Sequence, residues 1–147
     1  MTFENLSPSE RIQFFTPDID FKLEAPSKIA SWLDSCATRL LRSVESLEYV
    51  FCTDDALLEI NKEYLQHDYY TDIITFPLQD SPIEGLLYIS IDRVRENALE
   101  LGYSFKQELH RVMVHGLLHL MGYDDKTDVE KSAMREMENE CLQLLKL

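Results

Sequence analysis

Alternation between apolar and polar residues predicts four β-strands in the chain. Side chains of a strand point to opposite faces in turn, so a strand with one buried face carries an apolar residue at every second position. Ile19, Phe21 and Leu23 follow this pattern around Asp20 and Lys22. The other three segments are residues 47–51, 73–78 and 86–91. The last two are also rich in β-branched and aromatic residues, which favour strands.

Apolar residues spaced three and four apart predict five helices. These cover approximately residues 26–41, 54–61, 92–101, 105–121 and 128–144. Pro26 suits a first helical turn, and Ser104 and Thr127 each begin a capping box. We therefore expect an α/β (α+β) fold in which a small mixed four-stranded sheet packs against about five helices. No segment resembles a linker, so we expect one domain over residues 1–147. The order of the strands is left open.

The net charge narrows the range of partners. The 147 residues include 14 Lys and Arg against 27 Asp and Glu, which gives a formal net charge of −13. Such a chain repels phosphate backbones and anionic lipids at long range. A DNA-coating protein and a polybasic membrane binder are therefore excluded, and no DNA or membrane partner is expected.

The cysteines and the N-terminal residues indicate a cytoplasmic location. Cys36, Cys52 and Cys141 are odd in number, far apart and set among apolar residues, which fits reduced thiols that fill a core. The first fifteen residues lack a basic region followed by an apolar run, so no signal peptide is expected. The apolar stretches are only a few residues long, too short to cross a bilayer.

One segment carries the pattern of a metal site. It reads His-Gly-Leu-Leu-His-Leu-Met-Gly-Tyr-Asp-Asp over residues 115–125. His115 and His119 are four apart on a helix, so both rings project from one face. Gly122 ends the helix and lets the chain reverse, which brings Asp124 or Asp125 back over that face. Two imidazoles and a carboxylate suit one zinc ion per chain and leave a fourth position for a zinc-bound water.

Two alternatives compete with this interpretation. Paired histidines at helical spacing can simply be buried and hydrogen-bonded, but burying two polar rings among leucines costs free energy unless a partner satisfies them. Metalloproteases of the zincin type share the spacing of His115, His119, Gly122 and Asp125. Their catalytic glutamate follows the first histidine, and here that position is Gly116. A glycine cannot act as a base, so peptidase activity is not expected.

The same segment resembles the hallmark of the bacterial YbeY family, H-G-x-L-H-L-x-G-Y-D-H, at ten of its eleven positions. Residues 57–64, 70–77, 89–98 and 136–145 are similar to other segments of that family. The resemblance implies a zinc-dependent endoribonuclease of the cytoplasm that is specific for single-stranded RNA. It also implies a role in ribosomal RNA processing, 16S rRNA 3′-end maturation and ribosome quality control.

Three positions depart from the family pattern. Asp125 replaces the third ligand histidine; a carboxylate still binds zinc, but it makes a bound water harder to ionise. Leu65 replaces an arginine thought to face the substrate channel, which removes a bidentate phosphate partner. Leu86 follows Gly85 where the family has aspartate. Asp124 matches the family's aspartate, and it is a candidate for proton transfer beside solvent and the 2′-hydroxyl of the RNA.

The remaining candidates are substrate contacts. Arg93 and Arg111 flank the motif in a segment with four basic and three acidic residues, 93–111, and they are the candidates for phosphate binding. Ser90 and Thr71 are hydroxyl candidates, although Ser90 equally suits a helix cap. His110 lies about 140° around the helix from His115, so it is interpreted as a surface or groove histidine. His67 is expected in a solvated loop.

A non-catalytic role is the main alternative. In it, the metal is structural and the protein is a ribosome-assembly factor whose acidic surface binds basic proteins of the small ribosomal subunit. The net charge of −13 and the missing arginine at position 65 favour this alternative.

Overall fold

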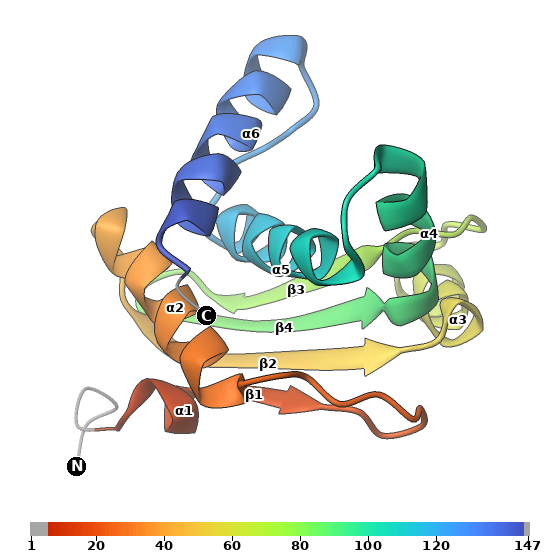
Figure 1. The fold of residues 1–147 in the computed structure, drawn as a ribbon, viewed down its shortest axis with the longest axis horizontal. Helices are drawn as coiled ribbons and strands as arrows, with labels where there is room; N and C mark the ends of the chain where they lie inside the picture. Colours follow the sequence, from red (N-terminus) through yellow and green to blue (C-terminus); the bar gives the residue numbers. More distant parts are fainter. Residues whose placement is uncertain (1–5, 146–147) are drawn as a thin grey trace.

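The computed structural model describes residues 6–145 and contains a four-stranded sheet with six helices in that range (Figure 1). The strands are β1 (Ile12–Phe15), β2 (Val44–Cys52), β3 (Ile73–Gln79) and β4 (Ile83–Ser90). The helices are α1 (Pro8–Arg11), α2 (Pro26–Arg39), α3 (Asp54–Leu65), α4 (Ile91–Leu101), α5 (Phe105–Leu120) and α6 (Asp128–Gln143). The α/β class and the mixed sheet predicted from the sequence are confirmed.

The strands lie in the order β1-β2-β4-β3. The pairs β1–β2 and β2–β4 are parallel, whereas β3 pairs with β4 in the antiparallel direction. Parallel neighbouring strands must be joined by a crossover connection. Helix α2 lies in the connection from β1 to β2, and α3 lies in the connection from β2 to β4. Strand β3 is an edge strand whose first residue, Ile73, pairs with Ile89 of β4.

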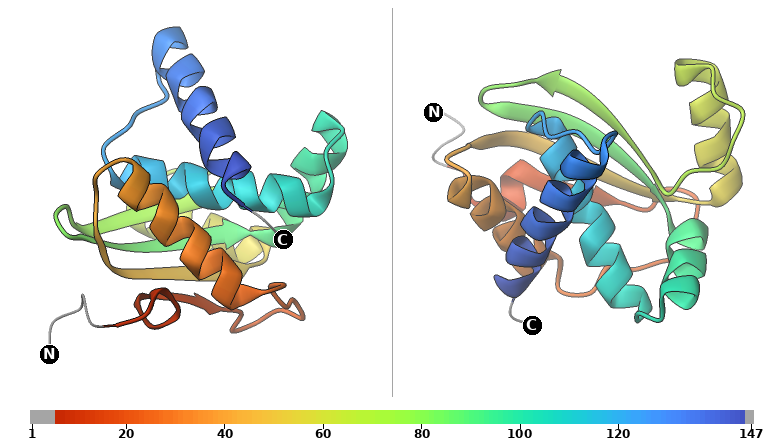
Figure 2. Two further views of the ribbon diagram at one scale, coloured as in Figure 1. Left: turned by 60° about the vertical axis from the view of Figure 1, so that its left-hand side comes forward. Right: turned by 90° about the horizontal axis from the view of Figure 1, so that it is seen from above.

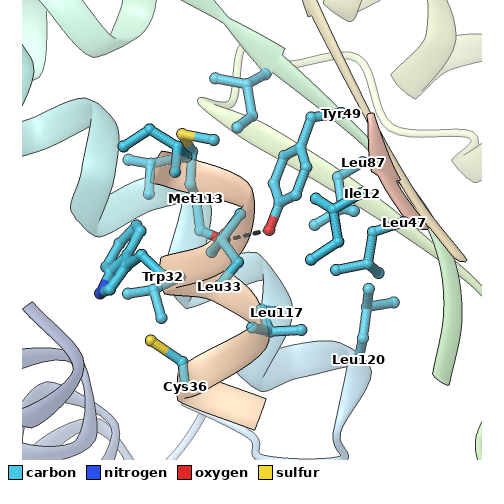
Figure 3. Packing of buried hydrophobic residues seen from close by; sticks show 14 of the residues in the cluster. Ile12, Trp32, Leu33, Cys36, Leu47, Tyr49, Leu87, Met113, Leu117 and Leu120 are labelled. Carbon is cyan, nitrogen blue, oxygen red and sulfur yellow. Dashed lines mark hydrogen bonds between the residues drawn. The ribbon is translucent and has the colours of Figure 1, made fainter. Parts of the chain in front are cut away.

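Helix α5 lies across one face of the sheet together with α2, and α3 packs on the opposite face (Figures 1 and 2). The main core forms between α2, α5 and the sheet, and its centre holds the buried ring of Tyr49. The Tyr49 hydroxyl donates a hydrogen bond to the Met113 carbonyl at 2.9 Å (Figure 3). Leu57 of α3 forms a second, smaller cluster with Cys52 and Ile74.

The first predicted strand is wrong. Residues 16–25 form turns and irregular backbone, and the first strand is Ile12–Phe15 instead. The alternating apolar side chains have another cause, because Phe21 packs edge-on against Phe51 at 5.3 Å and Phe105 at 6.0 Å between ring centroids. A loop that inserts aromatic rings into the core at intervals produces the same pattern as a strand.

The five predicted helices are confirmed, and α1 is an additional short one. Ser104 and Thr127 form capping boxes as predicted. All three cysteines are free and buried, which confirms their assignment as core residues. None of the helices between residues 6 and 145 has both the length and the apolar character required to cross a membrane.

Candidate metal centre

Gly116 sets how closely helix α5 approaches the sheet at the candidate metal centre. A Cβ atom at this position would lie 2.5 Å from Cδ1 of Ile73 and 2.7 Å from Cδ2 of Leu87. Carbon atoms pack at about 3.5–4.0 Å, so only glycine fits without displacing these side chains. The position that holds the catalytic glutamate of a metalloprotease therefore faces the sheet.

Gly122 returns the chain to the two histidines as predicted. Its φ of 97° lies in the left-handed region that favours glycine, and Tyr123 donates its backbone N–H to the Leu118 carbonyl at 3.1 Å. The reversal brings Oδ2 of Asp125 to 3.3 Å from His115 Nε2 and 3.5 Å from His119 Nε2. The two Nε2 atoms are 3.0 Å apart.

These three atoms have the spacing of ligands around one small cation. Ligands bound at about 2.0–2.1 Å in a tetrahedral arrangement lie about 3.3 Å from one another. In the described part of the chain, His115, His119 and Asp125 form the group of His, Cys, Asp or Glu residues in which three potential ligand atoms lie within 4.8 Å of one another. The residues therefore fit a single metal ion with one or more open positions.

Glu138 of α6 fixes the orientation of His115. Its Oε2 lies 2.6 Å from His115 Nδ1, and its Oε1 accepts a hydrogen bond from Arg111 at 2.9 Å. When Nδ1 donates a hydrogen bond to Glu138, Nε2 of the neutral imidazole presents its lone pair to His119 and Asp125. A carboxylate behind a ligand histidine is a common partner in metal sites, and Glu138 is 4% exposed.

The cluster attracts positive charge. Burial alone would lower the pKa of His115, but the hydrogen bond and charge of Glu138, together with Asp125 and Asp72, raise it. Burial would raise the pKa of Glu138, but its hydrogen bonds from His115 and Arg111 lower it. A proton and a metal cation therefore compete for the same place, and metal binding must weaken as the pH falls.

Two cavities meet at His115. We call the larger, of about 510 Å³, the loop-side cavity, because it extends towards the loop between α3 and β3. The smaller, of about 270 Å³, is the α6-side cavity. His115, Asp72 and Asp125 line both cavities, and His119 lines the loop-side cavity. A molecule in either cavity can therefore reach the candidate metal centre.

Only some of the residues predicted to contact substrate line these cavities. Thr71 lines the loop-side cavity. Ser90 is fully buried, caps α4 by accepting from the Arg93 N–H at 3.1 Å, and is therefore unsuited to touch a substrate. Asp124 is exposed and lines neither cavity. The helix-cap alternative for Ser90 is thus the correct one.

Both predicted phosphate-binding arginines are already paired with acidic groups. Arg93 bonds Asp54 at 2.7 Å and approaches Glu96 at 3.4 Å, away from both cavities. Arg111 lines the α6-side cavity, but its guanidinium bonds Glu138 and also Asn139 at 2.8 Å. The positive segment 93–111 therefore does not form a free basic groove.

Of the two positions predicted for His110, the surface is wrong because the residue is only 5% exposed, whereas the groove is confirmed because it lines two cavities. Its ring packs edge-on against Trp32 at 5.8 Å. Burial, helped by the charge of Lys106, lowers the pKa of His110 to about 4, so the imidazole is neutral at neutral pH. His67, in contrast, is exposed in a loop as predicted, and it lines the loop-side cavity.

Besides Glu138, two further acidic residues at the site cannot be recognised from the sequence, the buried Glu108 and the half-buried Asp72. Glu108 is 5% exposed, lines the α6-side cavity, and its Oε1 has no hydrogen-bond partner among the described residues. Burial, reinforced by the charge of Asp72, raises the pKa of Glu108. Burial also raises the pKa of Asp72. Glu108 precedes His115 by seven residues, or two helical turns, and that spacing could have placed both on one face.

A mixed sheet crossed by a helix that presents two histidines and a returning carboxylate defines an α/β protein with a zincin-like candidate metal centre. The chain belongs to the YbeY family, because the family model described as endoribonuclease YbeY matches residues 12–146.

Relatives named endoribonuclease YbeY resemble the chain over most of its length. The one from Cytophaga hutchinsonii is 48% identical over 93% of this chain and 97% of its own. The one from Flavobacterium psychrophilum is 44% identical over 88% of this chain and 94% of its own. The solution structure of TM1509 from Thermotoga maritima has a TM-score of 0.64 at 26% identity, covering 91% of this chain and 88% of that one.

Proposed function

We propose that this protein is a metal-dependent endoribonuclease that acts in ribosomal RNA processing. The observation that carries the proposal is the convergence of two imidazole nitrogens and one carboxylate oxygen, 3.0–3.5 Å apart, at the meeting point of two cavities. The names of its relatives supply the reaction class.

His115, His119 and Asp125 would hold the ion, and their nitrogen and oxygen donors suit Zn²⁺. The ion would supply positive charge that activates a water molecule and stabilises the charge developing on a phosphodiester. Glu138 keeps His115 in the ligand tautomer, and Gly116 keeps α5 close to the sheet so that both imidazoles face the cavities.

Proton transfer requires a group beside the reacting atoms, and two carboxyl groups compete for this role. Asp124 is the candidate from the sequence, but it lies outside both cavities. Glu108 lies inside the α6-side cavity with a raised pKa and an unpartnered oxygen, which suits a group that takes up and releases a proton during the reaction. Glu108 is therefore the preferred candidate, and Glu108→Gln is expected to lower cleavage more than Asp124→Asn.

The proposed substrate is single-stranded RNA, and the proposed site of action is the 3′ end of 16S rRNA together with ribosome quality control. Thr71 is the hydroxyl that remains a substrate contact, because it lines the loop-side cavity. A cytoplasmic location belongs to the same proposal, and the three free buried cysteines support it, since a reducing compartment keeps such thiols unpaired.

The test combines metal analysis with an RNA cleavage assay. Purified protein is expected to bind one zinc ion per chain and to cut a single-stranded RNA. His115→Ala and Asp125→Ala are expected to lose both properties, whereas Glu136→Gln, an exposed change on α6, is expected to keep them. Equal cleavage by the wild type and His115→Ala would indicate a contaminating nuclease and reject the proposal, as would a wild type without stoichiometric metal.

A non-catalytic assembly factor is the second candidate, and the paired arginines favour it. Arg93 and Arg111 bond carboxylates, so neither of these two arginines is free to attract RNA phosphates. In this alternative the acidic chain binds basic small-subunit proteins. Salt-sensitive capture of those proteins by metal-loaded protein that leaves RNA intact would support it, and RNA cleavage that depends on His115 would reject it.

A further inference from the structure

An exposed aromatic pair borders the candidate metal centre. His67 and Tyr69 lie in the loop between α3 and β3, and both line the loop-side cavity with His115, His119 and Asp125. Their rings are nearly parallel, at an interplanar angle of 21° and 5.0 Å between centroids, and the Tyr69 hydroxyl lies 2.9 Å from His67 Nδ1. Tyr69 is 56% exposed. The pair thus presents a flat aromatic surface beside the ligand atoms.

Asn61 holds this pair in place. The Asn61 side chain is 1% exposed and donates from Nδ2 to the Tyr69 carbonyl at 2.8 Å. The Asn61 backbone carbonyl accepts from the His67 N–H at 3.1 Å. Two hydrogen bonds from one buried residue of α3 therefore anchor both halves of the pair, so the exposed rings are part of the folded framework.

The neighbouring tyrosines have other roles. Arg93 lies over the ring of Tyr70 at 5.5 Å, and the Tyr70 hydroxyl donates to Asp55 at 3.2 Å. Tyr64 packs edge-on against Phe76 at 6.0 Å. Neither Tyr64 nor Tyr70 lines the loop-side cavity. Of the aromatic residues between 64 and 70, only His67 and Tyr69 face the metal centre.

The charges around the cavity make stacking the available means of holding RNA. The residues that line it include the acidic Asp72 and Asp125 and no Lys or Arg, within the described chain. Leu65 lines it where the family has an arginine. Apart from the ion that His115, His119 and Asp125 would hold, this cavity therefore offers little positive charge to RNA phosphates. Unpaired bases, however, stack on aromatic side chains without any charge.

We propose that His67 and Tyr69 form a base-stacking platform that holds an unpaired nucleobase of single-stranded RNA beside the metal centre. The inference rests on the proposed endoribonuclease function and specifies how that site recognises its substrate. A base within a duplex has both faces covered by its neighbours, so the platform selects single strands. It also replaces, by stacking, the phosphate contact that Leu65 cannot make.

The first test measures binding of a fluorescently labelled oligouridylate to the metal-loaded protein, together with its cleavage. Loss of one stacked base weakens binding by about 5- to 100-fold, and this loss is expected for Tyr69→Ala. Tyr69→Phe keeps the ring and is expected to bind within about 2-fold of the wild type. Tyr103→Ala is the matched control, because Tyr103 is 40% exposed and lines a different cavity. Thermal unfolding checks that every variant is folded.

The second test uses oligonucleotides with one abasic nucleotide, moved along the strand. At the nucleotide whose base stacks on the platform, the abasic change is expected to weaken binding by the wild type. It should not weaken binding by Tyr69→Ala, because this variant already lacks the ring on which that base would stack. At other positions both proteins are expected to respond equally. Such coupling at one position cannot arise from a general loss of folding.

The outcomes separate this inference from the proposed function. Wild-type cleavage combined with unchanged binding by Tyr69→Ala overturns the platform and leaves the endoribonuclease proposal standing. Weaker binding by Tyr69→Ala without cleavage by the wild type keeps the platform and overturns the hydrolysis. A metal-loaded wild type that neither binds nor cuts the oligouridylate overturns both.

Discussion

Glu138 and His115 are 23 residues apart in the sequence and 2.6 Å apart in the structure, with Oε2 of the first facing Nδ1 of the second. The contact joins α6 to α5 and places a buried carboxylate directly behind a metal-ligand candidate. Arg111 bonds the other Glu138 oxygen, so the negative charge is shared between a cation and an imidazole. The C-terminal helix is thus part of the candidate metal centre although it supplies none of the three candidate ligands.

Replacing this carboxylate should weaken metal binding without removing a ligand. Glu138→Gln keeps the shape of the side chain but removes the charge that orients and polarises His115. Removing a hydrogen-bond partner of a ligand histidine typically weakens metal binding, and a loss of about 10- to 100-fold in affinity is expected here. Competition with a chelator measures it. Glu136→Gln on the exposed side of α6 is the control, and equal affinity of the two variants would contradict the assigned role.

Gly116 provides a prediction about stability. Alanine normally stabilises a helix relative to glycine by about 1 kcal/mol, yet Gly116→Ala is expected to destabilise this protein by about 1–3 kcal/mol. The reason is the close contact that a Cβ atom would make with Cδ1 of Ile73 and Cδ2 of Leu87. Urea unfolding of the metal-free protein measures the change.

A second substitution tests the cause of that loss. Ile73→Val removes the Cδ1 atom that the new methyl group would meet, so Gly116→Ala should cost less in the Ile73→Val background than in the wild type. Additive effects of the two changes on the free energy of unfolding would show that the steric explanation is mistaken.

The three candidate metal ligands could be predicted because their geometry is local. His115 and His119 are related by one helical turn, and Gly122 sits where the chain must reverse to return Asp125. Helix periodicity and the conformational freedom of glycine suffice for this prediction. The same reasoning excluded peptidase activity at Gly116, but it could not explain why a glycine is there, since the cause lies in β3 and β4.

What could not be predicted depends on contacts between distant segments. Arg111 is a residue type that often binds phosphate. Only the packing of α6 shows that its guanidinium already bonds Glu138 and Asn139. Strand β1 is four residues long, and it is stabilised by pairing with β2, so its own sequence carries too weak a signal. The strand predicted around Phe21 is wrong, because a loop residue whose ring packs in the core gives the same apolar–polar alternation as a strand.

Buried His110 makes the stability depend on pH in a defined window. Its pKa falls from 6.5 in the unfolded chain to about 4 in the folded protein. Between these values the unfolded chain binds a proton that the folded protein excludes, so stability is present above about pH 6.5 and is lost as the pH falls towards 4. The loss approaches about 1.4 kcal/mol per pH unit within this window.

His110→Phe removes the titrating group and should therefore lose less stability than the wild type on acidification. Urea unfolding of metal-free protein at about pH 7 and about pH 5 measures this difference. Lys106→Gln removes a charge that lowers the His110 pKa, so it should raise the lower edge of the window and reduce the loss of stability on acidification. Parallel pH profiles for the wild type and His110→Phe would mean that another group causes the loss.

Restoring the family arginine should change how the protein holds RNA. Leu65 is 40% exposed at the end of α3 and lines the loop-side cavity, so Leu65→Arg places a guanidinium beside the path of a bound strand. A charge-assisted phosphate contact is expected to raise affinity for single-stranded RNA by about 3- to 10-fold. Each added phosphate contact should also steepen the dependence of log affinity on log salt concentration by about 0.7.

Leu99→Arg is the matched control for this prediction, because Leu99 is 83% exposed on α4 and lines neither cavity at the metal centre. Both variants change the net charge of −13 by the same amount. Binding titrations over a range of salt concentrations should therefore show the gain and the steeper slope for Leu65→Arg alone. An equal gain for both variants would mean that reduced repulsion by the whole acidic surface, and not a phosphate contact in the loop-side cavity, limits the binding of RNA.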